Sequence, residues 1–318
     1  MSILNIKEKI KYLSKNLDKH NHFYYVLDRP QITDFEYDNL MSELISLENK
    51  YPEFKDPLSP SSRVGGEVLE KFQTVAHRFA MLSLDNTYSE YDLKAFDKRV
   101  KKILNKDQVD YSCELKYDGV AISLIYKNGL FQKAITRGDG LFGDDVTENI
   151  KTIKSIPLKL SGDFPDELEL RGEVFITKLN FEKINNNRIS QKEEIRKNYE
   201  LELNNGSLDL KEKKKLEKKY IAESNKLELY SNPRNLASGT LKLLDSYKVA
   251  KRNLSCIVYS VHSNQMFNTH MDSLLECKKW GFLTSLEMDL GMNIDDVIRF
   301  VSDCEVKRNS LPFEIDGV

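Results

Sequence analysis

The first fifty residues carry apolar side chains at helical spacing. They recur three or four positions apart in two runs, Ile6, Ile10, Leu13 and Leu17, then Leu40, Leu44 and Leu47. Pro30 marks a turn between the runs, and Asp34 is a favourable N-cap for the second helix. Prolines and serines between residues 52 and 62 then indicate a linker. The pattern predicts a small helical domain over residues 1–70.

Beyond the linker, polar and apolar positions alternate with the period of two that indicates β-strands. Such stretches cover residues 111–126, 130–136, 168–176, 254–261 and 313–318. Lys127, Asn128 and Gly129 join the first two as a hairpin, and a bulge at Gly172 is expected to align the apolar positions of the third. Helical segments alternate irregularly with these strands. Residues 71–318 are therefore predicted to form a second domain of mainly antiparallel sheets with flanking helices, which gives an α+β fold.

Between Asn185 and Tyr230 the chain is dense in lysine, glutamate and asparagine and poor in large apolar residues. This composition predicts a solvated helical hairpin that turns near Asn204, Asn205 and Gly206. The alternative is a basic strip that touches DNA.

The net charge is only −2 over 318 residues, so no overall basic field indicates a polyanionic partner. No apolar run approaches the roughly 20 residues that a membrane span needs, and the charged N-terminus lacks the apolar core of a secretory signal. These features predict a cytoplasmic protein without membrane attachment. Cys113, Cys256, Cys277 and Cys304 lie far apart, which predicts reduced thiols rather than a zinc site or disulfides.

Three predicted strands each carry charged side chains two residues apart on one face. The sets are Glu114, Lys116 and Asp118; Arg171 and Glu173; and Glu314 and Asp316. One such strand would more often be a solvated sheet edge. Three in one chain, with Gly119, Gly172 and Gly317 beside them, instead indicate a polar cleft for a charged ligand.

Lys116 is the candidate nucleophile of this cleft. An amine on a rigid strand can attack phosphorus once its pKa, ordinarily about 10.4, is lowered by desolvation or by neighbouring cations. Asp118 can orient the ammonium or hold a metal, and Gly119 leaves space for a phosphate. The alternative is that Lys116 and Asp118 form only a structural ion pair.

Two loops present further cations. Arg137 lies in a glycine-bracketed loop, where it could engage a phosphate or a ribose or could be a surface arginine in a turn. Arg234 lies in the loop at residues 232–235, ahead of small residues and Lys242, where backbone amides could approach an anion. A helix N-terminus without a ligand is equally compatible with this second loop.

In combination these segments resemble a known family. Residues 116–119 match the K-x-D-G signature of covalent nucleotidyltransferases, which include DNA ligases, RNA ligases and mRNA capping enzymes. The companion segments are residues 113–116, 134–140, 170–175, 231–235 and 313–318. In this order they resemble the adenylation domain of NAD-dependent DNA ligases over essentially the whole chain.

The N-terminal helical domain resembles the module that binds nicotinamide mononucleotide (NMN) in the NAD-dependent branch and that ATP-dependent relatives lack. The similar residues are Tyr24, Tyr25 and Asp28, followed by Asp34, Phe35, Glu36, Tyr37 and Asp38. The resemblance implies that these residues, Asp28 excepted, bind the NMN half of NAD, although many relatives have histidine at the position of Tyr25. The alternative is that these residues only pack an amphipathic helix pair.

The resemblance also implies roles in the second domain, a nucleotidyltransferase domain, where Lys116 would form the AMP adduct. Nucleotide contacts are implied for Ser83, Leu84, Glu114, Arg137, Glu173 and Tyr259, and phosphate or DNA contacts for Arg234 and Lys242. Many relatives have arginine at the last position. Asp118, Glu173 and Asp316 would hold Mg²⁺ or Mn²⁺ directly or through water.

By the same resemblance, AMP would pass to the 5′-phosphate of nicked double-stranded DNA, and the neighbouring 3′-hydroxyl would seal the nick in replication and repair. The chain ends before the family's last lysine motif and its zinc module, which predicts a fragment without zinc, limited to self-adenylation. The fragment is expected to be a monomer. Two alternatives stay open at this stage, an ATP-dependent polynucleotide ligase and a non-catalytic nucleotide- or DNA-binding module.

Overall fold

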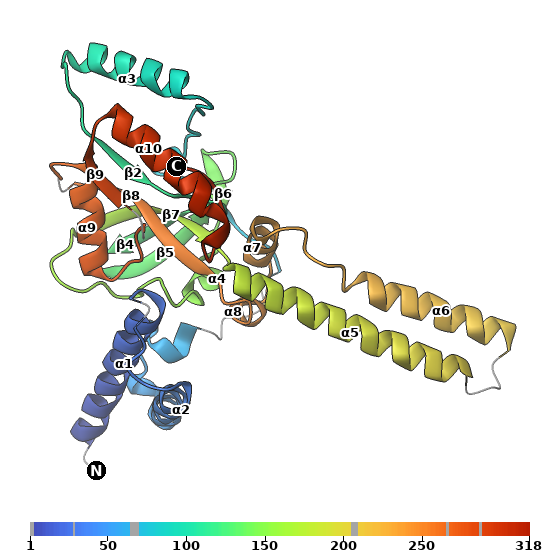
Figure 1. Cartoon of the computed structure of the whole chain (residues 1–318). Helices are drawn as coiled ribbons and strands as arrows, with labels where there is room; N and C mark the ends of the chain where they lie inside the picture. Colours follow the sequence, from blue (N-terminus) through green and yellow to red (C-terminus); the bar gives the residue numbers. More distant parts are fainter. Residues whose placement is uncertain (1–2, 28, 64–69, 205–208, 265–266, 286–287) are drawn as a thin grey trace.

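The computed structural model describes residues 3–27, 29–63, 70–204, 209–264, 267–285 and 288–318. Asp28 and most of the expected turn at residues 204–206 lie outside the described residues. A pair of helices at the N-terminus leads into a domain built around a sheet, and a long helical hairpin projects from that domain (Figure 1). This combination of helices and antiparallel strands confirms the predicted α+β class.

The N-terminal unit is formed by α1 (Ile3–Tyr25) and α2 (Asp34–Lys50). Its core consists of Ile6, Ile10, Leu13, Leu17 and Leu44, which confirms the helical reading of the apolar spacing. Thr33, not Asp34, is the N-cap of α2. Its hydroxyl accepts from the Glu36 amide at 3.2 Å, and the Glu36 carboxylate accepts from the Thr33 amide at 2.8 Å. This capping box places Asp34 in the first turn, where its charge still favours the helix dipole.

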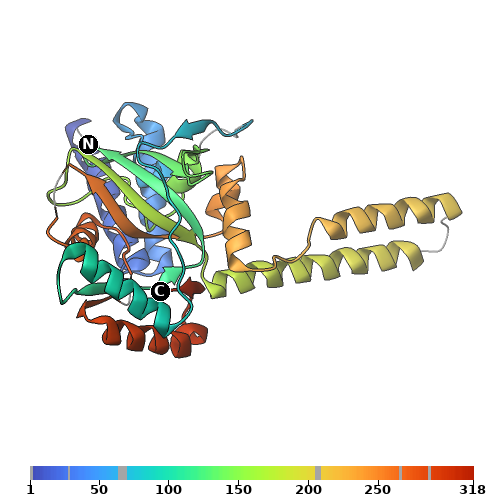
Figure 2. The same ribbon diagram turned by 90° about the horizontal axis from the view of Figure 1, so that it is seen from above.

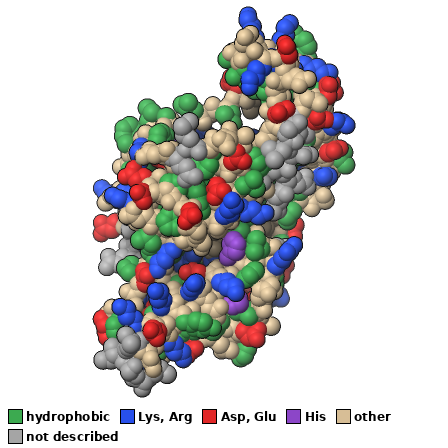
Figure 3. Space-filling model, turned by 90° about the vertical axis from the view of Figure 1, so that its left-hand side faces the viewer, with side chains coloured by type: hydrophobic (Ala, Val, Ile, Leu, Met, Phe, Trp, Pro, Cys, Tyr) green, Lys and Arg blue, Asp and Glu red, His purple; other side chains and the backbone are tan. Residues whose placement is uncertain are grey.

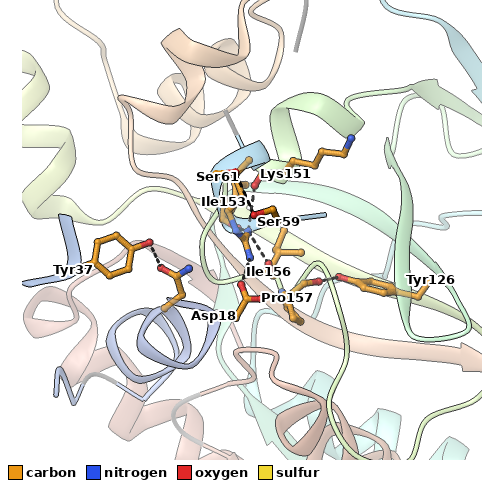
Figure 4. A network of polar contacts seen from close by, with 11 residues as sticks. Asp18, Tyr37, Ser59, Ser61, Tyr126, Lys151, Ile153, Ile156 and Pro157 are labelled. Atoms are coloured by element: carbon orange, nitrogen blue, oxygen red, sulfur yellow. Dashed lines mark hydrogen bonds and ion pairs between the residues drawn. The ribbon is translucent and has the colours of Figure 1, made fainter. Parts of the chain in front are cut away.

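Two short 3-10 helices, η1 (Pro52–Phe54) and η2 (Pro60–Arg63), lie in the expected linker. Arg63 ties this linker to the sheet domain. Its Nη1 donates to the carbonyls of Lys151, Ile153 and Ile156 at 3.1 to 3.2 Å, within the polar network of Figure 4. Because Arg63 is only 6% exposed, its buried guanidinium anchors the helical unit to the rest of the chain.

Four antiparallel strands form the central sheet in the order β5, β4, β7, β8. Their bounds are β4 (Val120–Lys127), β5 (Leu130–Thr136), β7 (Glu167–Phe175) and β8 (Ser255–Ser263). Asn128 and Gly129 join β4 to β5 with φ of 51° and 71°, the left-handed values of a two-residue hairpin turn. The predicted hairpin is therefore confirmed.

The expected single strand over residues 111–126 is wrong, because successive parts of it pair with different partners. β2 pairs with β9, β3 pairs with β10, and β4 joins the central sheet; a further small sheet pairs β1 with β6. The bounds are β1 (Thr74–Ala76), β2 (Tyr111–Glu114), β3 (Lys116–Tyr117), β6 (Phe142–Asp144), β9 (Met288–Met292) and β10 (Ile315–Gly317). Local alternation cannot reveal such a division, because the partners lie far along the chain.

The expected bulge at Gly172 also needs correction. β7 pairs with β4 without interruption, so its apolar residues share one face with no extra residue. The register shift lies in the pairing with β8, where Tyr259 is the extra residue. Gly172 instead marks a close approach of two strands, since a Cβ on it would lie 2.6 Å from the Ile257 carbonyl oxygen.

One face of the central sheet is apolar and the other is polar. Ile122, Leu124, Leu170 and Val174 are all 0% exposed in the main core. The helices that contribute to this core are α4 (Thr147–Lys151), α7 (Pro233–Leu241), α8 (Ser246–Ala250) and α9 (His270–Trp280). The opposite face is therefore left for polar side chains from β4, β7 and β8.

The expected helical hairpin is formed by α5 (Lys178–Asn204) and α6 (Leu210–Asn225), which we call the arm. It extends away from the body in both views (Figures 1 and 2), and no described residue of either helix is buried. The rings of Tyr199 and Tyr220 stack between the helices with centroids 4.6 Å apart. The remaining helices are α3 (Glu90–Leu104), α10 (Ile294–Lys307) and the 3-10 helix η3 (Arg308–Ser310).

All four cysteines are buried thiols that form no disulfide with a described residue, as expected of reduced thiols. Over the described part of the chain, no helix combines the length and apolar character that a membrane span requires.

Candidate active site

Lys116 lies where the short strands β3 and β10 pair. Its neighbours Leu115 and Tyr117 are each 6% exposed and pack into an apolar cluster with Phe313, which fixes the backbone from which Lys116 projects. The Lys116 Nζ is 2.5 Å from the Asp316 Oδ1. The carboxylate paired with Lys116 is thus Asp316, and not the Asp118 that the local spacing offered as an alternative.

Asp118 is held by a second cation, Arg234. The Arg234 Nη1 lies 2.9 Å from the Asp118 Oδ1 and 3.9 Å from the Asp316 Oδ2. The hydrogen bond that the Arg234 guanidinium donates to Asp118 raises the pKa of Arg234. Asn232 starts α7 and so positions Arg234, because its side chain accepts from the Asn235 amide at 2.7 Å. A chain of alternating charges therefore runs from the candidate nucleophile to α7.

Glu173 lies on β7 beside this chain of charges. Burial raises its pKa from 4.5 to about 7, while the nearby cations Arg234 and Lys116 oppose the rise. Gly119 allows the close packing here, since a Cβ on it would lie 2.3 Å from the Val174 carbonyl oxygen and 3.0 Å from the Glu173 Cγ. At neutral pH this carboxyl is therefore poised between its charged and neutral forms.

Arg137 follows β5 in the glycine-bracketed loop. Gly138 has φ of 55°, and a Cβ on it would lie 1.9 Å from the Phe142 carbonyl oxygen, so the turn requires glycine. The Arg137 Nη2 is 3.4 Å from the Ser83 Oγ. The structure thus brings together two residues that the resemblance assigned to the nucleotide.

A buried ion pair braces the polar face of the central sheet behind these residues. Arg171 and Glu169 are each 4% exposed and 2.9 Å apart, and the Ser123 Oγ donates to Glu169 at 2.7 Å. Arg171 also donates to the Phe79 carbonyl, in the segment that leads to Ser83. Arg171 therefore holds this segment against the sheet.

Tyr259 is placed on the polar face by the bulge in β8. Its pKa is raised to about 12 by burial and by the Glu173 carboxylate, with Arg171 opposing the rise. The phenol therefore stays protonated at neutral pH. Because its ring is still 37% exposed, it offers a surface beside Glu173 on which a base could stack.

Two side chains that contact glutamates at the site were missed by the sequence reasoning. The His270 Nε2 is 2.7 Å from the Glu114 Oε1, and the Lys178 Nζ is 3.6 Å from the Glu314 Oε1. Each partner is the first residue of a helix, α9 or α5. No local motif marks either residue, because only the tertiary fold brings these helix starts to the strands.

Leu84 and Lys242 lie at the margins of this arrangement. Leu84 is 84% exposed. Lys242 is the exposed C-cap of α7, and its backbone lies about 12 Å along the helix axis from that of Arg234. Arg234 and Lys242 therefore project from opposite ends of α7.

The N-terminal residues assigned to NMN lie apart from Lys116. Those on α1 and α2 are Tyr24, Tyr25, Asp34, Phe35, Glu36, Tyr37 and Asp38. The Lys154 Nζ is 5.2 Å from the ring centroids of both Tyr25 and Tyr37, so this unit rests on the segment after α4. In Figure 1 the unit lies below the sheet, whereas the C-terminus, next to β10, lies above it. The present arrangement therefore does not gather these residues around Lys116.

Asp118, Glu173 and Asp316 are the carboxylates that could hold a metal ion. In the part of the chain that the structure describes, no three Asp, Glu, His or Cys side chains form a metal-binding group. Their oxygen donors still suit Mg²⁺, which commonly takes one or two carboxylates and completes its shell with phosphates and water. The site therefore fits a metal ion that arrives with a phosphate ligand rather than one caged by the protein alone.

These side chains form an arrangement suited to attack on a phosphate ester. An exposed amine projects from a braced strand, two arginines lie where they can balance phosphate charge, and a buried carboxyl can accept hydrogen bonds. The amine is held in place by Asp316 rather than by its sequence neighbour.

Comparisons with known proteins agree with this geometry. Residues 69–223 and 207–318 match the NAD-dependent DNA ligase adenylation domain, and residues 4–65 match the DNA ligase-like N-terminal NAD⁺-binding domain. A DNA ligase of Flavobacterium johnsoniae is 44% identical over 316 residues, which cover 99% of this chain and 42% of that protein. A DNA ligase of Thermosipho africanus is 41% identical over 314 residues, 98% of this chain and 42% of the relative. The chain spans about 42% of the length of these curated relatives.

Proposed function

The chain belongs to the family of NAD-dependent DNA ligase adenylation domains, and from that premise we propose that it transfers AMP from NAD to its own Lys116. The contact that carries the proposal is the 2.5 Å pair between Lys116 and Asp316, set beside Arg234 and Glu173. This arrangement supplies a fixed amine, a carboxylate that contacts it, and a cation for the phosphate.

In the proposed reaction the neutral Lys116 amine attacks the adenylyl phosphorus of NAD. A bond forms between nitrogen and phosphorus, and the bond to the bridging oxygen breaks, so that NMN leaves with its own phosphate. The nitrogen loses a proton, for which Asp316 is the carboxylate in contact. The product is a lysyl phosphoramidate of AMP.

The other side chains would bind the two halves of NAD. Arg137 and Arg234 lie where they can contact phosphate, and Glu173 can accept from ribose hydroxyls. Contacts with the adenosine half are proposed for Ser83, Leu84, Glu114 and Tyr259, and contacts with the NMN half for Tyr24, Tyr25, Asp34, Phe35, Glu36, Tyr37 and Asp38. Lys242 is proposed to contact phosphate or DNA.

The match of residues 4–65 to an NAD⁺-binding domain favours NAD over ATP as the AMP donor. We also propose Mg²⁺ or Mn²⁺ held at Asp118, Glu173 or Asp316, where the ion would neutralise phosphate charge as NMN departs.

In the complete enzyme we propose that the adduct serves nick sealing in double-stranded DNA, in replication and repair. The DNA ligase relatives support this role for a longer protein.

We further propose a helical NMN-binding domain at residues 1–70, a nucleotidyltransferase domain at residues 71–318, a monomeric state and a cytoplasmic location. The family matches, which meet between residues 65 and 69, support that division.

Intact mass after incubation with NAD and Mg²⁺ tests the proposal. We expect the chain to gain one AMP, and Lys116→Ala to gain none. Lys127→Ala, which removes an exposed lysine at the end of β4, is the matched control and should keep the adduct. An adduct that forms with ATP but never with NAD, or one that persists in Lys116→Ala, would contradict the proposal.

A further inference from the structure

Four lysines form a ridge on one side of α6, in the arm. The lysine ridge consists of Lys211, Lys214, Lys215 and Lys218. Their spacing of three and four residues places them on one helix face, and all four are exposed. Tyr220 lies on a different face and stacks on Tyr199 of α5. The lysine ridge therefore points away from the partner helix and into solvent.

The lysine ridge is not neutralised by its surroundings. None of its members forms an ion pair with a described residue, whereas Arg196 on α5 pairs with Glu200 at 2.8 Å. The Glu212 carboxylate of α6 instead accepts from the Asp209 amide at 2.9 Å. α6 carries six lysines and three glutamates, a net charge of +3, in a chain of net charge −2. On the face of the body in Figure 3, by contrast, basic and acidic side chains are interspersed.

The base of the arm is fixed to the body beside Lys116. Asn185 and Tyr230 exchange hydrogen bonds of 3.0 and 3.1 Å, and the Arg188 guanidinium lies 4.1 Å from the Tyr230 ring centroid. α5 begins at Lys178, which contacts Glu314, the residue just before β10. The helix that follows the arm, α7, carries Arg234. The arm thus leaves and rejoins the body at the candidate active site.

The length of the arm matches one turn of duplex DNA. At about 1.5 Å per residue, the 27 residues of α5 extend about 40 Å from the body. α6 runs back from the tip, so the lysine ridge lies roughly 25 to 40 Å from the base of the arm. One turn of B-form DNA rises about 34 Å. A duplex that leaves the active site along the arm would therefore turn its phosphates toward the lysine ridge after about one turn.

We propose that the lysine ridge binds the phosphate backbone of double-stranded DNA about one helical turn from the nick. Lysine contacts with phosphates release condensed counterions and do not depend on base sequence. An acidic protein surface is the other polyanion that lysines could bind, but the match between arm length and helical repeat favours DNA. The inference rests on the proposed function, because that function brings the nick to Lys116.

Fluorescence anisotropy with nicked duplexes tests the proposal on the whole chain. One duplex carries about 6 base pairs on each side of the nick and the other about 16, so that only the longer one reaches the lysine ridge. We expect the longer duplex to bind at least about tenfold more tightly at low salt. Replacing the four ridge lysines with glutamine should remove this gain and lower the salt slope of log K by about 3 to 4. Glutamine keeps a helix propensity close to that of lysine, so α6 should persist.

α1 supplies a matched control, because its five lysines and two acidic residues give the same net charge of +3. The control variant replaces four exposed lysines of α1, Lys7, Lys11, Lys15 and Lys19, with glutamine. The proposal is overturned if this variant loses as much affinity as the ridge variant, or if duplex length has no effect on the unmodified chain. Competition by polyglutamate as effective as that by duplex DNA would instead identify an acidic protein partner.

The AMP adduct separates this proposal from the proposed function. The ridge variant should still gain one AMP from NAD, because the lysine ridge lies far from Lys116. If the unmodified chain forms no adduct, the proposed function is wrong. If the adduct forms normally but the ridge variant binds DNA as tightly as the unmodified chain, only the proposed role of the arm is wrong.

Discussion

The ionised form of the Glu173 carboxyl is disfavoured, because the side chain is largely buried on β7 while the nearest cations contact other carboxylates. Arg234 forms an ion pair with Asp118, and Lys116 forms one with Asp316. A carboxyl in this position takes up a proton readily until a new positive charge or hydrogen-bond donor arrives. Ribose hydroxyls or a metal ion would supply such partners, so the raised pKa of Glu173 suits a ligand-binding role.

The pKa of Glu173 predicts how stability depends on pH. Because burial raises it from 4.5 to about 7, the folded chain binds more protons than the unfolded chain between these values. Stability from this group is fully present below about pH 4.5 and is lost as pH rises through about 7, by roughly 3 kcal/mol. Glu173→Gln should remove that decline. Urea unfolding at pH 5 and pH 8 measures it.

Glu305→Gln, which changes an exposed glutamate on α10, is the control and should leave the pH dependence unchanged. A Glu173→Gln variant that loses as much stability between the two pH values as the unmodified chain would show that Glu173 does not titrate in this range.

At the scale of elements, the contacts between segments determine how the helical unit is attached to the sheet domain. The helix pair α1–α2 packs through its own apolar stripe, yet Arg63 is what fastens it to the sheet domain. A buried guanidinium that satisfies three carbonyls is costly to remove, because its loss leaves those acceptors without a donor.

Arg63→Ala should therefore lower the free energy of unfolding by about 3 kcal/mol. The carbonyls of Lys151, Ile153 and Ile156 would lose their donor, and the helical unit would lose its anchor. Urea unfolding gives the magnitude, and hydrogen exchange in α1 shows whether that unit loosens first.

The matched control is Arg196→Ala, which breaks an exposed pair within α5 and should cost less than about 0.5 kcal/mol. Equal losses of unfolding free energy in the two variants would mean that the burial of Arg63 does not increase its contribution to stability.

At the scale of the whole molecule, the two sets of proposed NAD contacts lie on separate parts of the chain. Tyr25 and Tyr37, from the set proposed for NMN, lie against Lys154, whereas Glu173, from the set proposed for AMP, lies near Lys116. One NAD molecule can bridge both sets only if the helical unit moves relative to the sheet domain. Such closing motions around a ligand are common in enzymes.

Energy transfer between dyes can measure this motion. Tyr12→Cys on α1 and Val306→Cys on α10 place labels at positions that are 66% and 84% exposed, while the four native thiols are buried. We expect NAD to shorten the distance between the labels, because α10 precedes β10, which pairs with the strand of Lys116. A distance that stays constant while the AMP adduct forms would exclude movement of the helical unit.

The sequence by itself determined the class of fold and indicated most of the proposed chemistry. Apolar spacing located α1 and α2, the charged and apolar-poor composition after Asn185 located the arm, the turn at Asn128 and Gly129 located a hairpin, and residues 116–119 marked the candidate nucleophile. These features are local, since helix periodicity, turn conformation and a short motif are each written within a few residues.

Only the tertiary structure decided which side chains meet. It divided residues 111–126 among three strand partners, moved the bulge to Tyr259 and paired Lys116 with Asp316 rather than with Asp118. It also held the helical unit away from the Lys116 site and set the arm beside it. The physical reason is that strand pairing and ion pairs such as Lys116–Asp316 join residues far apart along the chain, so they form only when the whole domain has packed.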